Sequence, residues 1–138
     1  MNRAEIVEFA RNNPICFIAT AADNTPFVRT VMLHSADDSG LIFSTWKQKD
    51  FYRQIVQNPR VEICLYNPQQ GRQIRLSGVL EALSDESLKD EIIRKFRFLN
   101  TQVQKMGRDS LVVYRLAKGQ ATSWTLSTAF EDKVYVDF

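Results

Sequence analysis

The arrangement of hydrophobic and polar positions predicts a chain made mainly of β-strands. Apolar runs of strand length lie at 15–21, 27–35, 41–45, 61–66, 72–83, 110–116 and 120–126, and a short alternating run lies at 134–138. Turn-forming residues separate several of these runs, as in Asp23-Asn24-Thr25-Pro26. The run at 15–21 is apolar at nearly every position, so we expect both of its faces to be covered. Gly78, inside the run at 72–83, predicts a bulge or a sharp bend.

Three segments carry the helical spacing of apolar residues, at 2–11, at about 50–57 and from 85 to about 99. Asp50 is placed to cap the second helix, which Asn58-Pro59 ends. Ser84 or Asp85 is placed to cap the third. Because strands dominate and strand–helix–strand alternation is absent, the predicted fold class is mainly β (α+β). It has six or so antiparallel strands, mostly joined as hairpins, in a barrel or an α+β domain.

The composition indicates an ordinary globular domain over residues 1–138. With 44% hydrophobic and 25% charged residues, the chain can bury a core without disulfides or metals. A net charge of +2 gives no argument for nucleic-acid or membrane binding. No apolar run approaches the roughly 20 residues of a membrane span. The N-terminus lacks a signal-peptide pattern, so we expect a cytoplasmic protein.

The familiar catalytic and metal-binding motifs are missing. One histidine cannot complete a nucleophile triad or a metal cluster, and the five glycines are too scattered for a phosphate loop. Cys16 and Cys64 lie inside apolar runs without a CxxC pattern. We therefore expect two buried free thiols and no metal site.

Polar residues gather at the ends of the predicted strands. There are three clusters: 29–34, then Ser44-Thr45 with Lys47 and Lys49, and then Arg72-Gln73. In the second cluster, hydroxyl and ammonium groups come directly before a helix start, where backbone N–H groups are also free. These groups together are suited to a phosphate. The three clusters supply cations for a phosphate, and amide and backbone groups for a polar heterocycle.

The order and spacing of these motifs resembles the pyridoxamine 5'-phosphate oxidase-like family of FMN-binding split barrels. The motifs are Arg29-Thr30-Val31-Met32-Leu33-His34, Phe43-Ser44-Thr45, the segment 54–61 and the segment 72–78, and the resemblance extends over about 15–126. It implies a six-stranded antiparallel split β-barrel with flanking helices. It also implies a homodimer with two FMN sites at the interface between the subunits.

The resemblance further implies which residues surround the FMN. The strand with Arg29, Thr30, Val31, Met32 and His34 would run beside the flavin and its phosphate, partly through backbone groups. Ser44 and Thr45 would contact the ribityl chain and the ring. Gln73 would reach the flavin from the partner subunit, and Trp124 would lie near it.

Departures from the oxidase pattern limit what the resemblance carries over. Asp50 and Phe51 occupy the positions of an Arg-Lys pair that holds the phosphate in the oxidase, which leaves that role to Lys47 and Lys49. His34 stands where the oxidase has a lysine. The oxidase's motifs for the vitamin phosphate have no convincing counterpart at 89–108 or in the tail. The resemblance therefore extends to the FMN site and not to the pyridoxamine substrate.

Three functions stay open at this point. The first is an FMN-dependent oxidoreductase acting with an unidentified small substrate or electron donor. The second is a flavin or haem carrier without turnover, and the third is a β-barrel interaction module. We favour the first, because the hydride or electron chemistry would belong to the flavin and needs no catalytic motif in the chain.

Overall fold

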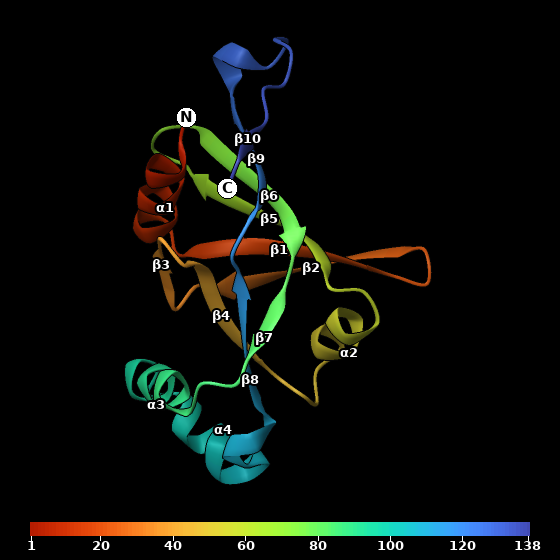
Figure 1. The fold of residues 1–138 in the computed structure, drawn as a ribbon, viewed down its shortest axis with the longest axis vertical. Coiled ribbons are helices and arrows are strands. Elements are labelled where there is room, and N and C mark those ends of the chain that lie inside the picture. The colour runs from red at the N-terminus through yellow and green to blue at the C-terminus, as the bar shows by residue number, and fades with distance from the viewer.

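The strands of the protein form two antiparallel sheets that share one hydrophobic core (Figure 1). The structure is a computed structural model that describes all residues, Met1–Phe138. The larger sheet has six strands in the order β10-β9-β6-β5-β1-β2, and the smaller has four in the order β3-β4-β8-β7. The larger sheet comprises β1 (Ile15–Ala22), β2 (Thr25–Met32), β5 (Arg60–Asn67), β6 (Arg72–Val79), β9 (Gly119–Thr125) and β10 (Val136–Asp137). The smaller comprises β3 (Ser35–Asp37), β4 (Gly40–Trp46), β7 (Glu81–Leu83) and β8 (Leu111–Leu116).

Four helices pack around these sheets. They are α1 (Arg3–Asn12), α2 (Asp50–Gln57), α3 (Glu86–Lys95) and α4 (Leu99–Met106). In Figure 1, α3 and α4 lie together at one end of the molecule, while the segment that follows β9 projects from the opposite end. The predicted mainly β, antiparallel α+β class is thus confirmed, with more strands and helices than the sequence pattern suggested.

The turn between β1 and β2 forms where the sequence predicts it. Asp23 and Asn24 adopt positive φ values of 50° and 57°, the left-handed conformation that tight hairpin turns require. Asp and Asn tolerate this conformation better than most residues. Pro26 is accommodated because β2 is an edge strand of the larger sheet.

The expectation that both faces of 15–21 are covered is wrong for the single chain. Cys16, Ile18 and Thr20 point into the core, but Ile15 and Phe17 on the other face are 52% and 43% exposed. In contrast, β4 is buried at every position except Ser44. The larger sheet therefore has one face on the core and one open face with apolar side chains.

The long strand expected at 72–83 is divided between the two sheets. It ends as β6 at Val79 and resumes as β7 at Glu81, so the chain crosses from one sheet to the other at Leu80. The bend predicted from Gly78 is therefore found two residues later. Gly78 itself permits a close approach, since an added Cβ would lie 2.7 Å from the carbonyl oxygen of Lys118. Strands β8 and β9 also belong to different sheets, so they form no hairpin.

Two helix predictions need correction. The third helix ends at Lys95, and a separate helix begins at Leu99. Ile92 and Leu99, one from each helix, pack into the same small second core. Asp85 caps α3 by accepting a hydrogen bond from the backbone N–H of Leu88. Asp50 does not cap α2, since it lies in the first turn and pairs with Arg53, while Lys49 occupies the cap position.

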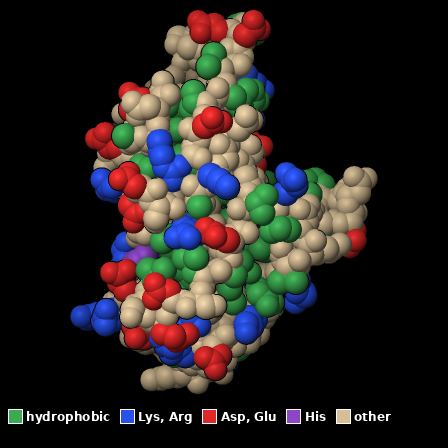
Figure 2. All heavy atoms as spheres, in the orientation of Figure 1, with side chains coloured by type: hydrophobic (Ala, Val, Ile, Leu, Met, Phe, Trp, Pro, Cys, Tyr) green, Lys and Arg blue, Asp and Glu red, His purple; other side chains and the backbone are tan.

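The surface carries both signs of charge. On the face drawn in Figure 2, acidic and basic side chains are interspersed around a group of hydrophobic side chains between the β1–β2 hairpin and the helical end. No helix in the structure is long and apolar enough to cross a membrane.

Candidate functional site

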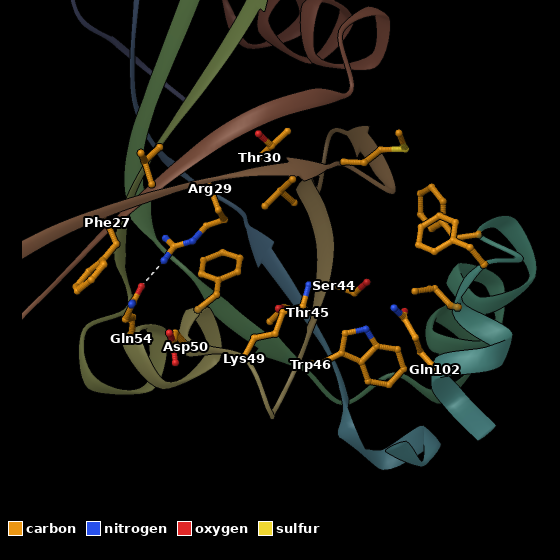
Figure 3. Close-up of a pocket in the computed structure, with 17 residues that line it drawn as sticks. Phe27, Arg29, Thr30, Ser44, Thr45, Trp46, Lys49, Asp50, Gln54 and Gln102 are labelled. Atoms are coloured by element: carbon orange, nitrogen blue, oxygen red, sulfur yellow. Dashed lines mark hydrogen bonds between the residues drawn. The ribbon is translucent and has the colours of Figure 1, made fainter. Parts of the chain in front are cut away.

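Strands β2 and β4, helix α2 and the α3–α4 segment surround a cavity of about 540 Å³ (Figure 3). This volume lies within the range of about 300–1,000 Å³ that small-molecule and cofactor sites occupy. Seven of the predicted site residues line it: Arg29, Thr30, Val31, Met32, Ser44, Thr45 and Lys49. The structure thus brings most of the first two polar clusters of the sequence together around one cavity, without His34 and Lys47.

Arg29 is held inside this cavity by neutral groups only. Its guanidinium donates hydrogen bonds to the carbonyl oxygen of Ile18 at 3.2 Å, to Thr20 Oγ1 at 2.8 Å and to Gln54 Oε1. It also lies over the ring of Phe51, with its central carbon 4.3 Å from the ring centroid. No carboxylate forms a salt bridge with it.

Partial burial lowers the pKa of Arg29, because it disfavours the charged form. The guanidinium nevertheless stays protonated near neutral pH, since arginine is not deprotonated in proteins. A half-buried cation with no counter-charge favours an anion in the cavity.

The start of α2 adds further groups for an anion. Lys49 occupies the N-cap position, and no side chain caps the first backbone N–H groups of the helix. Free N–H groups and the helix dipole make such an end favourable for negative charge. Asp50 opposes this effect, but its carboxylate is paired with Arg53. Within the chain, no hydrogen bond engages the hydroxyl of Ser44 or Thr45, so both can bind a ligand.

His34 lies outside the cavity. Its ring is buried, its Nε2 atom lies 2.9 Å from Glu91 Oε2, and Lys95 donates a hydrogen bond to its backbone carbonyl. The ring also meets Phe96 edge-on at 6.2 Å between centroids. The structure therefore places His34 in the contact that fixes α3 against the smaller sheet, away from the other predicted site residues.

Lys47, Gln73 and Trp124 also lie away from this cavity. Lys47 is exposed, and its backbone N–H donates to the carbonyl of Ser110. Gln73 and Trp124 are directly opposite each other on β6 and β9 and line a second cavity, of about 790 Å³, on the larger sheet. Within one chain, these two residues are not part of the group around Arg29.

Two parts of the cavity lining were not among the residues predicted from the sequence. One is the wall formed by the α3–α4 segment, and the other is Gln54 on α2. Phe96, Phe98, Leu99 and Gln102 come from the α3–α4 segment, which carries no motif. Gln54 is different, because it follows Phe51 by three residues and therefore faces the same side of α2. That spacing was a usable signal for a polar group directed into the site.

The two cysteine thiols give no sign of a reactive nucleophile or of a metal ligand. Cys16 is buried as predicted, and burial raises its pKa to about 12. Cys64 is only half-buried, and burial raises the pKa of its thiol as well. Both thiols are therefore protonated near neutral pH and weak as nucleophiles. No group of three or more His, Cys, Asp or Glu side chains is arranged to hold a metal ion.

Comparison with known proteins identifies the family. The sequence profile described as pyridoxamine 5'-phosphate oxidase matches residues 3–124. The chain belongs to this family. A curated pyridoxine/pyridoxamine 5'-phosphate oxidase from Rhizobium johnstonii is 29% identical over 85 residues, which cover 62% of this chain and 41% of that enzyme. The chain therefore spans less than half the length of the curated relatives it matches.

Solved structures support the same fold, the split barrel of the pyridoxamine 5'-phosphate oxidase family. A NimC/NimA family protein from Clostridium acetobutylicum superposes with a TM-score of 0.78 at 20% identity, covering 100% of this chain and 94% of that one. A FAD-binding protein from Mesorhizobium loti gives 0.66 at 18% identity over 89% of this chain and 94% of that one. A heme binding protein from Mycobacterium smegmatis gives 0.71 at 12% identity over 99% of this chain and 58% of that one.

The position of His34 yields a first prediction. Replacing His34 with Ala removes a buried ring and its bond to Glu91, so the free energy of unfolding should fall by about 1–3 kcal/mol. If the cavity holds FMN as the family resemblance implies, the FMN dissociation constant should stay unchanged, because the ring does not line the cavity. Urea denaturation and FMN fluorescence titration measure the two quantities. A loss of FMN affinity at unchanged stability would return His34 to the cofactor site.

Proposed function

We propose that this chain is an FMN-binding flavoprotein that acts as an oxidoreductase on a small substrate. The observation that carries the proposal is the half-buried guanidinium of Arg29, which has three neutral partners and no carboxylate. Such a site stabilises a bound anion, because the guanidinium has no counter-charge while the site is empty. The phosphate of FMN is such an anion.

The residues around the cavity fit the parts of FMN. Arg29, Lys49 and the uncapped start of α2 would hold the phosphate. The free hydroxyls of Ser44 and Thr45 are available to the polar ribityl chain. Strand β2 is an edge strand, so about half of its backbone groups have no ladder partner and can bind the ring. When bound, FMN would supply the hydride or electron chemistry.

The open face of the larger sheet supports a dimer. Ile15 and Phe17 on β1, Met32 on β2, Tyr66 on β5 and Trp124 on β9 are all 37–52% exposed on the single chain. Their strands are neighbours in the sheet, and the cross-strand register places these side chains on one face. Several large apolar side chains exposed on one sheet face, with polar residues such as Gln73 among them, are typical of an interaction site. We propose that a second copy covers it, in an interface of more than about 2,000 Å².

A dimer through this face would also complete the flavin site. Thr30 and Met32 belong to the same open face and line the cavity as well. A partner seated on the face would therefore lie directly beside the cavity. Gln73 and Trp124, which one chain keeps apart from Arg29, would then be available to the partner's flavin.

A flavin carrier without turnover is the second candidate. It is favoured by the lining of the cavity, which includes no His, Cys or Tyr and only one carboxylate, that of Asp50. The same lining argues against haem, because Met32 is its only side chain of a kind that ligates haem iron. The likeness to a heme binding protein is therefore a likeness of fold.

The absorption spectrum of the purified protein tests the proposal directly. A flavin spectrum, bleached by NAD(P)H or dithionite and restored with oxidation or reduction of a substrate, supports the oxidoreductase. A flavin spectrum without any turnover supports the carrier. If neither the purified protein nor protein mixed with FMN holds flavin, the proposal falls and an interaction module remains.

The missing carboxylate yields a second prediction. Gln54→Glu places a charged isostere against the guanidinium of Arg29, at the position where Gln54 Oε1 already accepts its hydrogen bond. The new ion pair should weaken FMN binding about tenfold or more while the fold stays intact. FMN titration and thermal unfolding check both parts. Gln57→Glu, on the same helix but outside the cavity, is the matched control and should bind FMN normally.

A third prediction separates the two lysines. Lys49→Ala should weaken FMN binding about tenfold and leave riboflavin binding unchanged, because only FMN carries the phosphate. Lys47→Ala is the control, since Lys47 does not line the cavity, and it should affect neither ligand. Parallel fluorescence titrations with both flavins give the answer. Equal weakening of FMN and riboflavin by Lys49→Ala would exclude a phosphate contact.

A fourth prediction tests the shared site. Light scattering should show a homodimer at micromolar concentration. A mixed dimer with Lys49→Ala in one subunit and Gln73→Ala in the other should keep one undamaged FMN site, because both changes fall on the same flavin. Stoichiometric titration would then find one site of wild-type affinity per dimer. Two equally weakened sites would mean that each chain uses its own Gln73, and a monomer would remove the shared site altogether.

A further inference from the structure

The cavity has a charged end and an uncharged end. All of its ionisable lining residues, namely Arg29, Lys49 and Asp50, belong to β2 and to the beginning of α2. Figure 3 shows Gln102 on the opposite side of the cavity from Arg29, with Ser44, Thr45 and Trp46 between them. The wall around Gln102 is formed by Phe96, Phe98 and Leu99. It contains aromatic and aliphatic groups and a single neutral amide.

Two aromatic rings stand at this wall: Phe96 packs partly against the second core, whereas Phe98 beside it is largely exposed. The rings of Phe96 and Phe98 lie 5.8 Å apart at an interplanar angle of 49°. Phe98 is 67% exposed, although a large apolar side chain gains by burial. A flat ring placed against this pair would bury apolar area and gain the favourable contact of aromatic neighbours.

No cation lines this wall. Lys95 donates a hydrogen bond to the carbonyl of His34, and neither Arg97 nor Lys105 lines the cavity. A partner copy on the open face of the larger sheet would present Arg75, which shares that face with Gln73. In each chain, however, Arg75 pairs with Glu62 at 3.3 Å. An anionic group buried at this end would therefore lack a counter-charge, which is unfavourable.

We propose that the substrate bound beside the flavin is an uncharged aromatic compound. Its ring packs against Phe96 and Phe98, and a neutral polar substituent meets the amide of Gln102, which can both donate and accept a hydrogen bond. Phosphorylated and carboxylated rings are rejected at this wall. The assignment rests on the proposed flavin site, because the flavin occupies the charged end.

Matched probes test the role of charge. Nicotinamide and nicotinate share one ring and differ in a neutral amide against a carboxylate, and pyridoxine 5'-phosphate adds a phosphate. Protein saturated with FMN is titrated with each compound, and the perturbation of the flavin spectrum reports binding. The dissociation constant of nicotinamide should be lower than that of either anion by a factor of about ten or more.

Variants locate the binding at the α3–α4 wall. Phe98→Ala should weaken nicotinamide binding about two- to tenfold and leave the FMN dissociation constant unchanged. Phe130→Ala, which removes a fully exposed ring outside the cavity, is the control and should change neither. Gln102→Arg supplies the missing cation and should reverse the preference, so that nicotinate binds more tightly than nicotinamide.

The outcomes separate this inference from the proposed function. If FMN binds but nicotinate or pyridoxine 5'-phosphate equals nicotinamide, the substrate class is wrong and the flavin site stands. The same conclusion follows if Phe98→Ala weakens FMN itself, because the flavin ring then occupies this wall. If FMN does not bind at all, both the flavin site and the substrate assignment are overturned.

Discussion

The position of the Arg29 guanidinium is the constraint on which the candidate site depends. A single side chain ties together the backbone of β1, a hydroxyl of the same strand and the amide of Gln54 on α2. Neutral acceptors orient the group without cancelling its charge, and the ring of Phe51 provides a further favourable contact. Fixing a charge in place before a ligand arrives lowers the ordering cost of binding.

The main strands, and the residues that β2 and β4 contribute to the cavity, were predictable from the sequence. Alternation along β2 directed Arg29 and Val31 inward, and the turn at Asp23-Asn24 joined β1 to β2 as expected. The division of 72–83 was less visible, because both halves are strand-forming and only the packing of two sheets decides that the chain crosses at Leu80. Similarly, the spacing of Ile92, Phe96 and Leu99 suits one long helix or two short ones.

The remaining part of the site could not be predicted from local pattern. His34 follows β2 closely in sequence, yet β2 ends at Met32 and the chain turns toward β3, so the ring meets Glu91 on α3 instead. Phe98 lies near the end of the helix predicted from 85 to about 99, and Gln102 lies beyond it, in a stretch without a clear pattern. Their place at the cavity follows from how α3 and α4 pack beside Trp46, a contact between residues about 50 positions apart in the chain.

The two hydrophobic cores of the molecule support different parts of the cavity. The larger one joins both sheets, α1 and α2, and it supports the strands that carry Arg29, Ser44 and Thr45. The smaller one lies under α3 and α4 and includes Ile42, Trp46, Ile92 and Leu99. The two cores meet at β4, whose opposite faces supply Leu41 and Phe43 to the larger core and Ile42 and Trp46 to the smaller one. Substitutions on the outer surface of segment 86–106 can therefore remodel one wall of the cavity without replacing any side chain of the larger core. The fold separates a part that can vary through evolution from the strands that hold Arg29 in place.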